Sequence, residues 1–231
     1  MSTNDRVLMF HNLPEKVDIE IEKDDVLTFD DGHYSVLRNV DLVKDLPNRK
    51  IVFIVPNFVS LDTRKEEPDC SEYWMDDFFL NGRRDQFLNL FEIEKLISLG
   101  FEVGMHSYYH DVVFVPGKHE FKEKNRRWYL HKISYGSSEF DDAMLKILTH
   151  KSALSVAGVD RMSDGLLRGR TAAEFEEYVK RDTELCVQWF KRFLFPVKSY
   201  AYPFFQTSDI LEKTLDYYGI TERFGERIYV T

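Results

Sequence analysis

Short apolar runs alternate along this chain with longer segments of helical periodicity. The runs lie at residues 7–10, 26–29, 51–55, 101–105 and 199–202, and several of them are apolar throughout. Continuous apolar runs of this length indicate strands that are buried on both faces, as in a parallel sheet covered by helices. The alternation therefore predicts an α/β protein with a largely parallel sheet.

Three segments of the chain have the spacing of amphipathic helices. Residues 86–99 and 209–218 place apolar side chains on one face, and each segment stops at a glycine, which suits a helix C-terminus. Residues 172–193 follow a capping box formed by Thr171 and Glu174. We expect all three segments to cover the sheet.

Residues 111–170 interrupt the alternation. They contain eleven Lys/Arg and eight Asp/Glu, a net charge of +3, which leaves −12 for the remainder of the chain. A helix-like pattern covers residues 141–154. The segment is too long for a plain connection between core elements, so we interpret it as a lid or specificity insertion. The expected organisation is a single domain, residues 1–231, with this insertion.

Composition and charge narrow the classes of protein to which the chain can belong. Its net charge of −9 disfavours general nucleic-acid binding. No stretch approaches the roughly 18 apolar residues of a transmembrane helix, and residues 1–6 lack the pattern of a secretory signal. Cys70 and Cys186 lie far apart and are expected to be separate thiols. A cytoplasmic protein is the simplest interpretation.

Two adjacent carboxylates follow the second apolar run, where residues 28–32 read TFDDG. Parallel α/β folds gather their active groups at the carboxyl ends of strands, so Asp30 and Asp31 are expected to face one pocket. The same residue types also form ordinary turns between strands. The carboxylates therefore gain functional meaning only together with a second motif.

That second motif follows the fourth apolar run, where residues 106–110 read HSYYH. One carboxylate and the two imidazoles of His106 and His110 are sufficient to hold zinc or a similar divalent ion and leave a position open for water. The second carboxylate would then be available as a base. A histidine pair at this spacing also occurs on ordinary helices without a function. Ser107 stands where the zinc-protease motif HExxH needs glutamate, which excludes that mechanism.

These motifs, in this order, resemble those of the NodB-type polysaccharide deacetylases, carbohydrate esterase family 4. TFDDG is similar to the first family motif and HSYYH to the second, while YAYPF at residues 200–204 resembles the third. VLMFH at residues 7–11 is similar to the strand that starts many members. The resemblance extends from residue 7 to about residue 205. It implies a distorted (β/α) barrel, here with about six to seven largely parallel strands and a long insertion.

The resemblance implies a metal site and a base. By this resemblance Asp31, His106 and His110 bind a divalent metal, most often Zn²⁺, with Co²⁺, Ni²⁺ or Fe²⁺ as alternatives. Asp30 is then the base that accepts a proton from the attacking water.

The resemblance also implies which residues meet the substrate. The backbone N–H of Phe204 would help to hold the oxyanion of the tetrahedral intermediate. Tyr202 and Pro203 would border the sugar, and Ser107 would orient the histidine loop or a ligand.

Two features depart from the usual family pattern. Many members carry an arginine in the third motif that supports the base, whereas Ala201 stands in this segment here. The general-acid histidine that members carry near the C-terminus is missing, because no histidine follows His150. The candidate proton donors are His33, His119, His131 and His150. A protonated Asp30 that returns its proton is the alternative.

The resemblance implies a metal-dependent hydrolase that removes the acetyl group from an N-acetylated sugar. The expected location favours a lipid-linked or nucleotide-linked precursor of a surface polysaccharide as substrate. The basic and aromatic stretch 118–132 is suited to contact a phosphate or an acidic sugar. Two alternatives remain open: another C–N amide hydrolase on the same scaffold, and a non-catalytic carbohydrate-binding protein that retains the metal.

Overall fold

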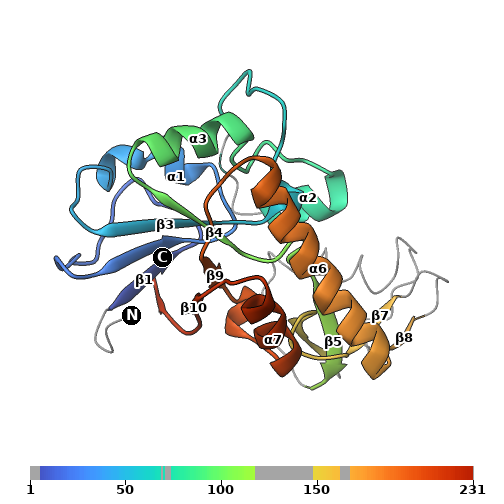
Figure 1. Cartoon of the computed structure of the whole chain (residues 1–231). Coiled ribbons are helices and arrows are strands. Elements are labelled where there is room, and N and C mark those ends of the chain that lie inside the picture. Colours follow the sequence, from blue (N-terminus) through green and yellow to red (C-terminus); the bar gives the residue numbers. More distant parts are fainter. Residues whose placement is uncertain (1–5, 69, 71–73, 118–147, 162–166, 231) are drawn as a thin grey trace.

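A seven-stranded parallel sheet forms the centre of the molecule (Figure 1). Its strands are β1 (Val7–Phe10), β2 (Val26–Phe29), β3 (Arg49–Ile54), β4 (Glu102–Met105), β9 (Ser199–Ala201), β10 (Glu222–Phe224) and β11 (Ile228–Tyr229). Every neighbouring pair is parallel, in the order β10-β9-β4-β3-β2-β1-β11. The computed structural model describes residues 6–68, 70, 74–117, 148–161 and 167–230.

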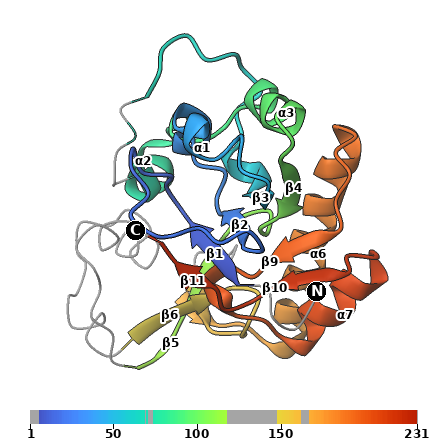
Figure 2. The ribbon, with the colours of Figure 1, turned by 90° about the vertical axis from the view of Figure 1, so that its left-hand side faces the viewer.

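The winding of this sheet is that of a distorted (β/α) barrel. From β1 to β10 the sheet follows the order of the chain, and each new strand is added beside the previous one. β11 returns to the far side of β1, so that β10 and β11 form the two edges of an open barrel (Figure 2). This arrangement confirms the fold class expected from the sequence. Because the strands are parallel and wound in one direction, all their carboxyl ends lie at one rim.

Helices cover the outer side of the sheet. They are α1 (Ser35–Arg38), α2 (Trp74–Asn81), α3 (Leu90–Ser98), α6 (Ala172–Arg192) and α7 (Asp209–Tyr217), with short 3₁₀ turns η1 (Val40–Leu42), η2 (Pro56–Phe58) and η3 (Pro203–Phe205). In Figure 1, α1 and α3 lie along one part of the sheet and α6 and α7 along another. The main hydrophobic core lies between sheet and helices.

Local sequence signals located most of these elements. All five apolar runs form strands, and the capping box of Thr171 and Glu174 begins α6 as predicted. α3 begins later than predicted, since Asn89 and Glu92 form a capping box there and residues 86–89 stay outside the helix. Both cysteines are free thiols, as expected.

A second, antiparallel sheet lies in the segment predicted to be an insertion. It consists of β5 (Val112–Pro116), β6 (Leu148–Ser152), β7 (Val159–Arg161) and β8 (Leu167–Gly169), in the order β6-β5-β7-β8. The helix-like pattern at residues 141–154 was therefore wrong for residues 148–152, because pairing with β5 decides their conformation. Residues 141–147 and the whole of the basic stretch 118–132 lie outside the described residues.

The two ends of the parallel strands differ in their polar groups. At the amino ends, the Arg49 guanidinium bridges Glu102 and Glu222, with 2.6 Å to an oxygen of each. These contacts join β3, β4 and β10. At the carboxyl ends lie the carboxylates and imidazoles of the two motifs. None of the helices within the described ranges has the length and apolar character that a membrane crossing requires.

Candidate metal centre

The two carboxylates lie where β2 ends. Asp30 prolongs the strand by donating its N–H to the carbonyl oxygen of Phe10 at 2.8 Å. The chain then turns sharply, with φ angles of 66° at Asp31 and 67° at Gly32. This left-handed region is easy for glycine but costs energy at an aspartate, and such strain persists where the surrounding structure holds it. Both carboxyl groups are buried at this turn.

The two imidazoles lie on the loop that follows β4. The N–H of His106 donates to the carbonyl oxygen of Ile54 at 3.0 Å, which holds the start of the loop against the end of β3. Ser107 and His110 have φ angles of 69° and 51°. The loop therefore doubles back, and the rings of His106 and His110 lie 4.9 Å apart between centroids.

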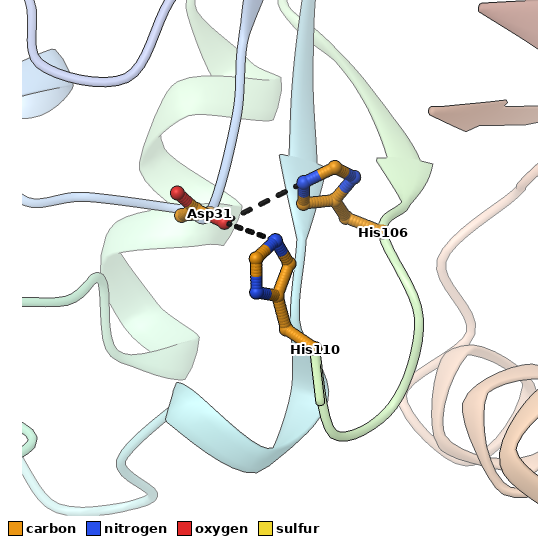
Figure 3. A group of neighbouring side chains, drawn as sticks. All are labelled: Asp31, His106 and His110. Atoms are coloured by element: carbon orange, nitrogen blue, oxygen red, sulfur yellow. Dashed lines mark ion pairs between the residues drawn. The ribbon is translucent and has the colours of Figure 1, made fainter. Parts of the chain in front are cut away.

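Asp31, His106 and His110 converge on one point (Figure 3). Oδ1 of Asp31 lies 3.5 Å from Nε2 of His106 and 3.4 Å from Nε2 of His110. The three ligand atoms all lie within 4.8 Å of one another, and all three side chains are buried. The two sequence motifs thus form one cluster, although 75 residues separate Asp31 from His106 along the chain.

The hydrogen bonds of this cluster fit a metal ion. Nδ1 of His106 lies 2.9 Å from the carbonyl oxygen of Ala201, so Nδ1 carries the proton and Nε2 offers its lone pair to the cluster. Neither carboxylate oxygen of Asp31 has a hydrogen-bond partner among the described residues. A buried carboxylate without partners is costly unless a cation compensates its charge. The set of one oxygen and two imidazole nitrogens suits zinc and similar divalent ions.

The electrostatics of the cluster agree with this interpretation. Burial raises the pKa of Asp31 well above its usual range, and the charge of Asp30 raises it further. Burial lowers the pKa of His106, and burial together with His106 lowers the pKa of His110 well below its usual range. Both imidazoles are therefore neutral and able to bind a metal, and the short distances to Asp31 are not ion pairs of charged histidines.

Asp30 has a different environment from its neighbour. Nη1 and Nη2 of Arg227 donate one hydrogen bond to each carboxylate oxygen of Asp30, both at 2.7 Å. Burial raises the pKa of Asp30, but the charge and hydrogen bonds of Arg227, together with the neighbouring imidazoles, outweigh this effect, and the pKa lies below its usual range. Asp30 is consequently ionised beside the cluster of Asp31, His106 and His110. Its Oδ2 lies 3.7 Å from Nε2 of His106.

Arg227 comes from the loop between β10 and β11, at the C-terminal end of the chain. Its guanidinium also donates to the hydroxyl of Thr28 at 3.1 Å and is 1% exposed. Ala201 occupies the segment in which the family resemblance places an arginine, and the arginine that bonds to Asp30 comes here from another part of the fold.

The histidine loop is held in shape by Asp182 of α6. Oδ2 of Asp182 accepts hydrogen bonds from the Ser107 hydroxyl and the Tyr109 N–H, each at 3.0 Å, and Oδ1 accepts one from the Tyr108 N–H at 3.0 Å. The Ser107 hydroxyl in turn accepts the N–H of His110 at 3.0 Å. Burial raises the pKa of Asp182 to about 6, although these donors oppose the increase. Ser107 was predicted to meet the substrate or to orient the histidine loop. Its hydroxyl links Asp182 to the N–H of His110 in that loop.

The third motif borders the cluster through Phe204. The Phe204 ring lies 5.0 Å from that of His110, and Phe204 has a φ angle of 58° in η3. The turn's own hydrogen bonds are donated by the N–H groups that follow Phe204 and not by Phe204 itself. Tyr202 instead directs its hydroxyl to Glu212 of α7, at 2.5 Å from Oε1, and Pro203 is buried at the start of η3.

One histidine that the sequence interpretation did not select lies beside the cluster. His11 follows β1, its Nε2 is 3.8 Å from Oδ2 of Asp31, and its side chain is 34% exposed. Its ring packs edge-on against Tyr229 at 5.3 Å. The sequence did contain a signal for His11, because a polar residue after a buried strand is the pattern that located Asp30.

The four histidines predicted as proton donors are placed differently. His33 is fully buried, and its Nδ1 is bonded to the hydroxyl and N–H of Ser35 at 2.9 and 3.3 Å. His150 in β6 packs edge-on against Phe204, with 5.3 Å between ring centroids. His119 and His131 lie outside the described residues.

Solved structures of deacetylases share this fold. The deacetylase domain of BpsB from Bordetella bronchiseptica is 14% identical, covers 98% of this chain and 95% of its own, and superposes with a TM-score of 0.58. A de-N-acetylase from Aggregatibacter actinomycetemcomitans is 15% identical, with coverages of 91% and 69% and a TM-score of 0.55. IcaB from Ammonifex degensii is 16% identical, with coverages of 98% and 86% and a TM-score of 0.52.

No family model and no curated protein matches the sequence. At identities of 14–16%, the likeness of the solved structures concerns the fold. The open barrel and its strand order agree with the expectation from the motifs. The chain therefore has the fold of the NodB-type polysaccharide deacetylases.

Proposed function

We propose that this protein is a metal-dependent deacetylase that removes the acetyl group from an N-acetylated sugar. The observation that carries the proposal is that two adjacent carboxylates have different environments. Asp31 is buried without a hydrogen-bond partner among the described residues, between two neutral imidazoles. Its neighbour Asp30 is kept ionised by Arg227. This division into a metal ligand and a base is what hydrolysis of an amide requires.

The fold supports the same proposal. Two proteins that share it are described as a deacetylase domain and a de-N-acetylase. A divalent ion held by Asp31, His106 and His110 would polarise the acetamide carbonyl and lower the pKa of a water molecule. Zn²⁺ is the ion we propose, because neutral imidazoles and one carboxylate are ligands that it favours. Co²⁺, Ni²⁺ and Fe²⁺ suit the same donors.

Residues of the chain supply the base and the oxyanion donor for the reaction. Asp30 accepts a proton from the attacking water while Arg227 holds the carboxylate in a fixed orientation. The oxygen of the water bonds to the carbonyl carbon, and the N–H of Phe204 donates a hydrogen bond to the resulting oxyanion. The C–N bond then breaks, and acetate and a free amine leave.

We assign the proton for the leaving amine to His11. His106, His110 and His33 are buried and their pKa values are lowered. His11 approaches Oδ2 of Asp31, whereas the two imidazole ligands approach Oδ1, and it is partly exposed, so it can exchange protons with solvent. His11→Gln should lower kcat for acetate release by about 100-fold and leave metal content unchanged. An equal loss of metal would instead make His11 a ligand.

The test of the function is acetate release from N-acetylglucosamine and its oligomers by the zinc-loaded protein. Asp30→Asn keeps the size of the side chain but removes the base, so turnover should fall by about 100-fold or more. Undiminished turnover in this variant would contradict the role of Asp30. Acetate release from other small amides, but not from sugars, would favour the alternative amide hydrolase. Glycan binding without any release would favour the non-catalytic alternative.

The natural form of the substrate is a further part of the proposal. We retain a lipid-linked or nucleotide-linked precursor of a surface polysaccharide, with the cytoplasm as location, as predicted from the sequence. Acetate release can be measured with the lipid-linked and the nucleotide-linked sugar in parallel with the free oligomers. A free oligomer turned over faster than either linked form would contradict this part alone.

A further inference from the structure

The last strand of the chain runs along the first strand. β11 pairs with β1 in parallel register, with Tyr229 opposite Met9, and the N–H of Val230 donates to the carbonyl oxygen of Met9 at 2.9 Å (Figure 2). Arg227, whose guanidinium holds Asp30, lies two residues before Tyr229. The segment that closes the edge of the barrel therefore also reaches the proposed active site.

The strand register fixes the face to which Tyr229 points. Leu8 and Phe10 of β1 belong to the core between sheet and helices, so Met9, which lies between them, faces the inside of the barrel. Tyr229 lies opposite Met9 and faces the same side. His11 follows Met9 by two residues, directly after the end of β1. The pairing of the two strands thereby brings the rings of Tyr229 and His11 together.

These two rings meet edge to face. Their centroids lie 5.3 Å apart and their planes are inclined at 63°, within the range of roughly 4.5–7 Å in which such aromatic pairs attract each other. The imidazole side chain is 34% exposed and the tyrosine 50%. Burial and, to a smaller extent, the charge of Asp31 raise the pKa of Tyr229, so its hydroxyl is within electrostatic reach of the metal centre. Tyr229 thus lies at the solvent-exposed edge of the site, beside the proposed acid.

The orientation of His11 matters for the reaction. A general acid acts only when its N–H lies within hydrogen-bond reach of the atom that takes the proton. A partly exposed imidazole can rotate between side-chain rotamers, and in some of them its N–H points away from the leaving nitrogen. An edge-to-face contact with a neighbouring ring favours one orientation by about twofold to tenfold. Tyr229 is placed to provide this preference.

We propose that Tyr229 is a positioning residue for His11, and that its ring holds the imidazole in the orientation from which the leaving amine is protonated. The proposal rests on the proposed deacetylase function and on the role assigned there to His11. The imidazolium of His11 gives one proton to the amine nitrogen as the C–N bond breaks and is left as neutral imidazole. The segment of Arg227 and Tyr229 then supports both proton transfers, the first through Asp30 and the second through His11.

Two variants of Tyr229 separate its ring from the rest of the strand. Tyr229→Leu removes the aromatic contact and retains an apolar side chain, whereas Tyr229→Phe keeps the ring and loses only the hydroxyl. Tyr217→Leu is the matched control, because Tyr217 is 82% exposed at the end of α7. If Tyr229→Leu does not fold, Tyr229→Val, whose side chain suits a strand, takes its place.

Two substrates distinguish the proton donor from the other groups of the site. An N-acetylglucosamine oligomer loses an amine, which must be protonated as the C–N bond breaks, whereas 4-nitrophenyl acetate loses a stable anion that needs no proton. In the zinc-loaded protein, Tyr229→Leu should lower kcat on the oligomer by about fivefold to tenfold and change KM and ester hydrolysis by less than about twofold. Tyr229→Phe and Tyr217→Leu should behave as the wild type. Asp30→Asn, which removes the base, should lose on both substrates.

The double variant shows whether Tyr229 acts through His11. In a His11→Gln background, Tyr229→Leu should cause no further loss on the oligomer, because the group that Tyr229 orients is gone. A further loss of the same size would overturn the proposal. Equal losses on oligomer and ester would also overturn it, as would a Tyr229→Phe variant that loses as much as Tyr229→Leu.

The contact can also be tested without any reaction, by proton NMR of the protein. The ring current of Tyr229 shifts the resonances of the carbon-bound protons of the His11 imidazole, which are identified by their loss in His11→Gln. Tyr229→Leu should move these resonances, and Tyr229→Phe should leave them near their wild-type positions. Unmoved resonances in Tyr229→Leu would overturn the proposed contact. Moved resonances in a protein that releases no acetate from N-acetylated sugars would keep the contact and reject the deacetylase function.

Discussion

Arg227 and Asp30, 197 residues apart in the sequence, form a bidentate ion pair. Each terminal nitrogen of the guanidinium meets one carboxylate oxygen at 2.7 Å, and both side chains are almost completely buried. The last loop of the chain thereby sets the charge of the proposed base. Because the ion pair is removed from solvent, its geometry matters more than the presence of a positive charge alone.

Arg227→Lys should separate geometry from charge. Lysine keeps the positive charge but cannot bond both carboxylate oxygens, so the pKa of Asp30 should rise toward that of an ordinary buried carboxyl. The acid limb of the kcat/KM profile for acetate release should then move to higher pH, and kcat should fall by about tenfold or more. Arg192→Lys, in the last turn of α6, is the control. An unmoved acid limb would refute the role of Arg227.

His106→Ala and His110→Ala should each abolish stoichiometric metal. Two of three protein ligands cannot hold a divalent ion at the affinity of a complete site. Elemental analysis of the purified proteins measures this directly, and His33→Asn is the control because His33 is buried but is not a ligand. Metal retained at full stoichiometry in either alanine variant would place the ligands elsewhere.

Removal of metal from the wild type should lower its stability. A ligand at about 1,000 times its Kd stabilises the folded state by about 4 kcal/mol. For a chain of this length, this corresponds to a decrease in Tm of about 10 °C on chelation. Calorimetry with and without chelator checks the value. The decrease should disappear in His106→Ala, whose Tm a chelator should not change.

Asp182→Asn should weaken metal binding although Asp182 contacts no ligand atom. The amide keeps one oxygen acceptor, whereas the histidine loop offers three donors to the carboxylate. The loop that carries His110 should loosen, and metal affinity should fall by about 10-fold to 100-fold, as for other residues that orient ligands. Competition with a chelator measures the affinity. Glu184→Gln on the exposed side of α6 is the control and should match the wild type.

His33 should make stability depend on pH. Burial, together with the charges of His11 and Arg64, lowers the pKa of His33 to about 4. In the unfolded chain a histidine titrates near pH 6.5. As the pH falls, His33 therefore becomes protonated in the unfolded chain at a higher pH than in the folded protein. Stability contributed by neutral His33 is complete above about pH 6.5 and is lost as pH falls toward 4, by about 3 kcal/mol in total.

Denaturant unfolding between pH 4 and 7 checks this dependence. His33→Asn retains a polar atom near the position of Nδ1, which is bonded to Ser35. The variant should have a flatter curve of unfolding free energy against pH than the wild type. Parallel curves for the two proteins would show that His33 titrates normally in the folded state.

The sequence by itself was sufficient for five strands of the parallel sheet, for three of the helices and for the three residues of the candidate metal site. Apolar runs located β1 to β4 and β9, and Thr171 with Glu174 located the start of α6. These signals are local, because burial on both faces and helix capping leave their pattern within a few residues. Asp31, His106 and His110 could be chosen for the same reason, since each lies close to the end of a predicted buried strand.

Only the tertiary structure decided which groups surround that core. Arg227, Asp182 and His11 reach the cluster from the last loop, from α6 and from β1. Nothing in the residues near them distinguishes Arg227 from the other arginines or Asp182 from the other acids of α6. Their roles arise from contacts over 197 and 75 residues of sequence, formed when the barrel brings the ends of its strands together. Burial at that meeting point then makes the charge of one carboxylate depend on an arginine far along the chain.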